Sequence, residues 1–115
     1  SYGLTKFPSD NNALVFWDHG GGWTGMGPDE TDGYDVLNLT EIRTGLQAGL
    51  AGADLDRLDL IGFDACLMAT YEVAASVAGL GEILVASLEL EPGHGWDSLH
   101  RGVFPNADAD ANEAC

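Results

Sequence analysis

Three short apolar runs, separated by polar and glycine-rich stretches, set the order of elements that the sequence predicts. The first run covers residues 13–17, the second residues 58–63 and the third residues 83–87. Near-continuous apolar runs of this length, bounded by turn-forming residues, are typical of strands buried in a parallel sheet. The pattern therefore predicts three strands.

The gap between the first two runs contains a predicted loop followed by a predicted helix. Residues 24–38 are rich in glycine, aspartate and threonine and have no sustained period, so we expect a long loop there. Thr40 can cap the helix that follows. Its inward stripe at helical spacing consists of Leu39, Ile42, Leu46 and Leu50.

The gap between the second and third runs contains a second predicted helix, which begins near Cys66 or Leu67 and stops at Gly79 and Gly81. Its expected inward stripe consists of Leu67, Tyr71, Ala74, Ala75 and Ala78. The order strand, helix, strand, helix, strand is typical of two right-handed βαβ units. The predicted fold class is therefore α/β with a parallel sheet.

A motif-like loop directly follows each predicted strand. The first loop contains His19, the second contains Cys66, and the third covers residues 89–96. The carboxyl ends of parallel strands lie at one edge of the sheet, with neighbouring strands about 4.8 Å apart. We therefore expect His19 and Cys66 to lie within one or two strand spacings of each other.

These loops contain the groups that cysteine acyl transfer requires: a thiolate, a proton donor for the leaving amine and N–H groups aimed at the oxyanion. Cys66 at a helix N-terminus would have its thiolate favoured by the helix dipole, with its own N–H directed to the same space. His19 can protonate the leaving group, and Gly20 can bring an N–H close to a substrate carbonyl. Asp64 would disfavour the thiolate if it faced the sulfur, so we expect it to point elsewhere, into a substrate pocket.

Composition and charge restrict the partners. The 115 residues suffice for one domain, and four Lys and Arg against nineteen Asp and Glu give a net charge of −15. Nucleic acid and anionic membrane are therefore poor partners, because both require clustered cations. The excess of acidic residues is interpreted as a solvated acidic surface. A more specific hypothesis is that it attracts basic substrates. No apolar stretch reaches membrane-spanning length and no signal peptide is expected in residues 1–10, so the compartment stays open.

Two other chemistries use some of the same residue types. The histidines and cysteines do not have zinc-type spacing, so no metal site is predicted from them; besides His19 and Cys66 they are His94, His100 and Cys115. Residues 19–23, HGGGW, also resemble the oxyanion motif of α/β-hydrolase esterases. Because no Gly-x-Ser-x-Gly elbow occurs in the sequence, an esterase is the less favoured alternative.

Three sequence blocks resemble successive motifs of the clostripain family of cysteine peptidases, in the caspase-like clan. They are WDHGGGW from residue 17, GFDACLMATYE from residue 62 and VASLELEPGHGW from residue 85. The separation of His19 from Cys66 is also similar to that in caspases, whose histidine lies about 50 residues upstream. The resemblance implies a caspase-like α/β/α sandwich, with residues 1–96 as a partial catalytic core and residues 97–115 as a polar tail or truncated continuation.

The same resemblance implies a cysteine endopeptidase that cleaves after Arg or Lys. His19 and Cys66 would form the catalytic dyad, the N–H groups of Gly20 and Cys66 would be the oxyanion donors, and Asp64 would bind the basic P1 side chain. Leu88 stands where the family pattern leads us to expect an acidic residue. An inactive remnant or a binding module with this fold is the alternative.

The implied partners and cofactors follow from that activity. Substrates would be peptides or proteins with a basic P1 residue, and no cofactor is required for the chemistry. The family's usual calcium dependence would carry over, although no ligand residues can be named. The residues leave the compartment unknown, and the family resemblance is compatible with secretion or a place in the cell envelope. A three-stranded sheet with unpaired edges is also expected to favour self-association.

Overall fold

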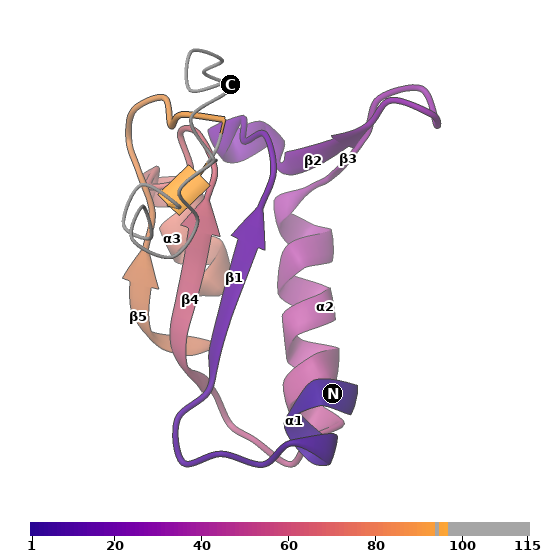
Figure 1. Cartoon of the computed structure of the whole chain (residues 1–115), viewed down its shortest axis with the longest axis vertical. Coiled ribbons are helices and arrows are strands. Elements are labelled where there is room, and N and C mark those ends of the chain that lie inside the picture. Colours follow the sequence, from indigo (N-terminus) through magenta and orange to yellow (C-terminus); the bar gives the residue numbers. More distant parts are fainter. Residues whose placement is uncertain (94, 97–115) are drawn as a thin grey trace, which may run out of the picture.

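A computed structural model describes residues 1–93, 95 and 96, and contains a three-stranded parallel sheet in the order β1-β4-β5. The strands are β1 (Ala13–Trp17), β4 (Leu58–Asp64) and β5 (Gly81–Val85). Helices α2 (Leu39–Ala51) and α3 (Tyr71–Val77) connect successive strands and contact each other (Figure 1). The predicted α/β fold with a mostly parallel sheet is therefore confirmed.

The strands lie close to their predicted positions. β1 covers the predicted residues 13–17, β4 continues one residue past the apolar run to Asp64, and β5 ends at Val85 instead of Ser87. Strand bounds were predictable because each strand is a run of apolar, often β-branched residues that ends at a polar or glycine-rich segment.

Helix α2 matches its predicted stripe but has a different cap. The N-cap is Asn38, whose side chain accepts hydrogen bonds from the N–H groups of Thr40 and Glu41. The Glu41 carboxylate in turn accepts from the Asn38 N–H, which completes a capping box. The expectation that Thr40 caps the helix is therefore wrong. Three of the predicted stripe residues are buried: Ile42, Leu46 and Leu50.

Helix α3 begins later than predicted. Thr70 is its N-cap and accepts a hydrogen bond from the Val73 N–H, whereas residues 66–69 form a turn. Leu67 in this turn has a φ of 62°, which a right-handed helix cannot contain. The predicted inward stripe is also wrong, since Tyr71 is 83% exposed and the buried helix residues are Val73 and Val77. Cys66 consequently does not lie at a helix N-terminus.

The predicted loop at residues 24–38 contains regular structure. After a 3-10 turn, η1 (Gly22–Thr24), strands β2 (Met26–Asp29) and β3 (Asp35–Leu37) form an antiparallel hairpin that projects from the sheet (Figure 1). Met26 fixes its base in the core. At the turn, the hydroxyl of Thr31 and then its N–H donate to the Asp29 carboxylate, and these hydrogen bonds lower the pKa of Asp29. The sequence pattern did not predict this hairpin, because Met26 is its only buried hydrophobic residue and one such residue makes no alternating pattern.

The core lies between the sheet and its two helices. Ile61, Phe63, Met68 and Val73 are fully buried there, and the rings of Phe16 and Phe63 stack with centroids 5.1 Å apart. A short helix that the sequence did not predict, α1 (Tyr2–Lys6), packs Leu4 against this core. In the described part of the chain, no helix is both long and apolar enough to cross a membrane.

In the described residues, the two connecting helices cover one face of the sheet, and a cavity lies elsewhere in the molecule. The uncovered face presents four exposed apolar side chains, Val15, Trp17, Ile83 and Val85. The cavity, of about 640 Å³, lies between α1, β1 and α2, and its wall includes Leu14 and Leu46. Its lining contains neither His19 nor Cys66, so the cavity does not mark the site predicted from the sequence.

Candidate active site

The three motif-bearing loops leave the sheet at the same edge, as the sequence predicted. Trp17, the last residue of β1, is the register partner of Asp64 at the end of β4, and Gly62 is the partner of Val85 at the end of β5. The chain therefore enters the three loops side by side, at the upper edge of the sheet in Figure 1.

The His19 loop packs directly against the Cys66 turn. A Cβ atom built on Gly20 would lie 2.2 Å from the carbonyl oxygen of Cys66 and 3.1 Å from the Cβ of Ala65. Only glycine allows this approach, because no side chain atom can occupy such a position without moving the backbone. Gly22, with a φ of 62°, makes a second close approach, to the Leu67 carbonyl oxygen.

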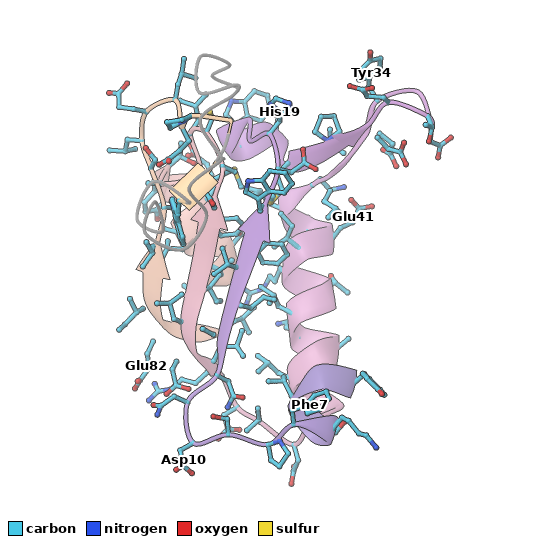
Figure 2. All side chains as sticks on the ribbon, in the orientation of Figure 1. Phe7, Asp10, His19, Tyr34, Glu41 and Glu82 are labelled. Carbon is cyan, nitrogen blue, oxygen red and sulfur yellow. The ribbon has the colours of Figure 1, made fainter. Side chains whose placement is uncertain are left out.

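Backbone contacts on both sides fix His19, whose side chain is exposed at the upper end of β1 (Figure 2). The Asp18 carboxylate accepts a hydrogen bond of 2.6 Å from the His19 N–H. The His19 carbonyl accepts one of 3.0 Å from the Gly27 N–H, so strand β2 supports the loop. Sequence reasoning missed both supports. The available signal for Asp18 was its position directly before the histidine, where Asp commonly binds nearby N–H groups.

Cys66 is fully buried in the turn between β4 and α3. The segment after β5 covers it, and the N–H of Glu91 lies 2.9 Å from the Cys66 sulfur. Two backbone hydrogen bonds hold that segment to the turn, from the N–H of Leu67 to Glu89 and from the N–H of Ala69 to Ser87. The third predicted loop is therefore a direct neighbour of the cysteine.

Asp64 lies against Gly95 and Trp96. Its Oδ2 accepts a hydrogen bond of 2.7 Å from the Trp96 N–H, whereas its Oδ1 is buried and has no hydrogen-bond partner in the structure. A buried carboxylate oxygen without a donor is unfavourable by about 1–3 kcal/mol, more if charged. It is the only buried side-chain oxygen or nitrogen without a partner in the described part of the chain.

A side-chain cluster for a metal ion is not found in the described residues. Within residues 1–93, 95 and 96, no group of three or more His, Cys, Asp or Glu side chains could hold a metal ion. Calcium prefers six to eight oxygen ligands, and carboxylates are its usual side-chain ligands. His94, His100 and Cys115 lie outside the described residues.

The structure brings a His-Gly-Gly loop, a cysteine turn and a buried carboxylate to one edge of a parallel α/β sheet. The particular family follows from the sequence, because the clostripain family model matches residues 1–113. The chain belongs to the clostripain family, and the resemblance of its three motif blocks to that family is confirmed. No curated protein matches the chain significantly.

Solved structures that are similar to the chain include two proteases. One is a secreted cysteine protease from Bacteroides thetaiotaomicron in complex with an irreversible peptide inhibitor, 27% identical with a TM-score of 0.67, and the match covers 80% of this chain and 26% of that one. The other is an inactive zymogen protease from Parabacteroides distasonis, 28% identical with a TM-score of 0.45, with 75% and 23% covered. The chain thus spans about a quarter of the length of the structures it matches.

Proposed function

We propose that this chain carries the catalytic dyad of a cysteine peptidase that cleaves after basic P1 residues, with Cys66 as nucleophile and His19 as its partner. The observation that carries the proposal is the direct packing of the His19 loop on the Cys66 turn, where Gly20 approaches the Cys66 carbonyl too closely for any side chain. Membership of the clostripain family and the solved protease from Bacteroides thetaiotaomicron support the same class of reaction.

The proposed reaction proceeds through an acyl-enzyme. His19 takes the proton of the Cys66 thiol, the thiolate attacks the scissile carbonyl carbon, and the N–H groups of Gly20 and Cys66 stabilise the oxyanion that forms. His19 protonates the leaving amine as the peptide C–N bond breaks, which leaves a thioester on Cys66. Water then attacks the thioester with His19 as base, releasing the acid product and the thiol. This sequence of steps requires no metal ion.

The proposed P1 preference rests on Asp64. Its buried Oδ1 has no donor, and a guanidinium or ammonium group of the substrate would supply one. The described cations lie elsewhere: Lys6 is in α1, Arg43 donates to the Ser76 carbonyl between the helices, and Arg57 pairs with Glu82 at the amino end of the sheet. In the described part of the chain, no cation therefore competes for Asp64.

Substrate access requires a change at the segment after β5. Cys66 is fully buried beside Glu91, and Gly95 and Trp96 lie against Asp64. A bound P1 side chain would replace the Trp96 N–H with charge-assisted donors, which are about twice as strong as neutral ones. The net charge of −15 also attracts cationic peptides, in addition to the hydrogen bonds at Asp64. This attraction weakens as the salt concentration rises.

A panel of fluorogenic peptides that differ only at P1 tests the proposal. We expect turnover of Arg and Lys peptides, little turnover of a Leu peptide, and loss of activity after alkylation of the thiol. The Cys66→Ala and His19→Ala variants should each lose about 10⁴-fold or more in kcat, with unchanged folding by circular dichroism. Activity that survives both substitutions would refute the dyad. A folded protein that binds the peptides without cleaving them would indicate a binding module.

Calcium and location are tested in the same preparation. A chelator added to the active protein measures the calcium dependence that the family implies. Secretion is proposed because the similar Bacteroides thetaiotaomicron protease is described as secreted. Fractionation of producing cells would test it, with activity expected in the medium or cell envelope.

A further inference from the structure

Trp17 and Asp64 lie side by side at the carboxyl edge of the sheet. They are register partners at the ends of β1 and β4, so their side chains leave the sheet on the same face. No helix of the described residues covers this face. Two residues earlier on each strand, Val15 and Gly62 lie together under the Trp96 ring. The opposite face holds the stacked rings of Phe16 and Phe63.

The indole and the carboxylate face the same small space. Gly95 occupies it with a φ of 65°, and a Cβ atom built there would lie 2.3 Å from Asp64 Oδ2 and 2.7 Å from the Trp17 Nε1. The two side chains differ in accessibility. Trp17 is 65% exposed, whereas the Oδ1 atom of Asp64 is buried without a partner. A group that reaches the carboxylate at this edge therefore passes beside the indole.

This pair of side chains distinguishes the two basic residues. An arginine guanidinium is planar and weakly hydrated, so it can stack on an indole while its edge binds a carboxylate through two hydrogen bonds. A lysine ammonium is a compact, strongly hydrated charge that can bind the carboxylate but gains less from the ring. Among aromatic side chains, tryptophan interacts best with cations.

We propose that Trp17 is a specificity-determining residue. Its indole forms a wall of the S1 pocket, which receives the P1 side chain beside Asp64, and selects arginine over lysine. This inference rests on the proposed role of Asp64 and adds to it a ranking of the two substrates. Binding of the guanidinium would displace Gly95 and the Trp96 N–H from Asp64 Oδ2, which opens the space between that oxygen and the indole.

The test compares Trp17→Leu, which removes the ring, with Trp17→Phe, which keeps a weaker one. Trp23→Leu is the matched control, because Trp23 is 70% exposed in η1 near the same edge but is not a register partner of Asp64. We expect Trp17→Leu to lower kcat/KM for the Arg peptide by about ten-fold or more and for the Lys peptide by about three-fold or less. Trp17→Phe should be intermediate, and Trp23→Leu should leave the Arg/Lys ratio unchanged.

Product binding separates this inference from the peptidase proposal. In a Cys66→Ala protein, calorimetry with peptides ending in Arg or Lys should show tighter binding of the Arg peptide, and Trp17→Leu should remove that difference. An unchanged Arg/Lys ratio in Trp17→Leu, or an equal change in Trp23→Leu, overturns the role of Trp17 and leaves the dyad intact. Absence of both turnover and binding with basic peptides overturns the two proposals together.

Discussion

The two faces of the central strand β4 differ in packing and in chemistry. Ile61 and Phe63 point to one face, are almost completely buried, and pack with α2 and α3 in one core. Gly62 and Asp64 point to the other, where no helix of the described chain covers the sheet and the neighbours Val15, Trp17 and Ile83 are exposed. Successive residues of one strand thus serve stability and the proposed substrate site alternately.

This difference shows how a short strand separates two requirements. Because side chains alternate across a strand, a change on the helix-covered face alters the core and a change on the open face alters the site. The buried, unpartnered carboxylate oxygen of Asp64 thus lies on the open face, whereas the fully buried Ile61 and Phe63 lie on the packed face. Substitutions on the two faces should therefore affect different measurements.

The largest expected effect is on the covered face. Phe63→Ala should lower the free energy of unfolding by about 3–5 kcal/mol, because it removes a fully buried ring that stacks on Phe16. Urea denaturation measures the loss. Phe7→Ala is the control, since Phe7 is 71% exposed and its removal should cost less than about 0.5 kcal/mol. Equal losses in the two variants would mean that the packed face does not dominate stability.

The next largest effect is on the open face. Asp64→Asn should lower kcat/KM for Arg peptides. The expected loss corresponds to about 2–5 kcal/mol of transition-state stabilisation, the range for losing one partner of a buried charge pair. The unfolding free energy should stay constant or rise, because the amide oxygen can still accept from Trp96 and the unpaired carboxylate is gone.

The matched control for Asp64→Asn is Asp59→Asn. Asp59 belongs to the same strand but lies toward the other edge, where its carboxylate accepts from the Asn12 N–H. The Asp59→Asn substitution should leave the preference for basic P1 residues unchanged. If Asp64→Asn reduces turnover of Arg and Leu peptides equally, Asp64 only orders the turn. That result would refute the proposed preference for basic P1 residues.

A smaller effect is expected at the start of α2, which covers the packed face. Asn38→Ala removes the capping box and should lower the unfolding free energy by about 1 kcal/mol. Thr40→Ala should change it by less than about 0.5 kcal/mol, since Thr40 is exposed and is not the cap. Thermal denaturation of both variants distinguishes the cap in the structure from the one predicted from the sequence. A larger loss in Thr40→Ala would reverse that assignment.

The smallest effect is expected from Ile83→Thr on the open face. Ile83 is 56% exposed, so the unfolding free energy should change by less than about 0.5 kcal/mol. Sedimentation velocity of the same variant tests the predicted self-association, which should weaken when an apolar residue beside the β5 edge becomes polar. A loss above about 1 kcal/mol would show that this face is covered in the protein.

The sequence by itself determined the parts that depend on local pattern. Apolar runs located β1, β4 and β5 to within two residues at each end, and helical spacing located the buried face of α2. Since the carboxyl ends of parallel strands share an edge, the order of elements also brought His19 and Cys66 to one edge. The motif blocks identified the family that the comparison confirms.

Only the tertiary structure decided the features that depend on contacts between distant segments. The β2–β3 hairpin carries too few apolar residues to be read from a pattern, because its stability comes from backbone pairing and from Met26 in the core. The late start of α3 depends on the turn at Cys66, which hydrogen-bonds to residues after β5. The pairing of Trp17 with Asp64, and of Asp64 with Trp96, required the register of separate strands and the path of a loop. The periodicity of apolar residues predicts which side of a single segment is buried. The register of strands and the contacts of loops involve segments far apart in the sequence, so they depend on the free energy of the whole fold.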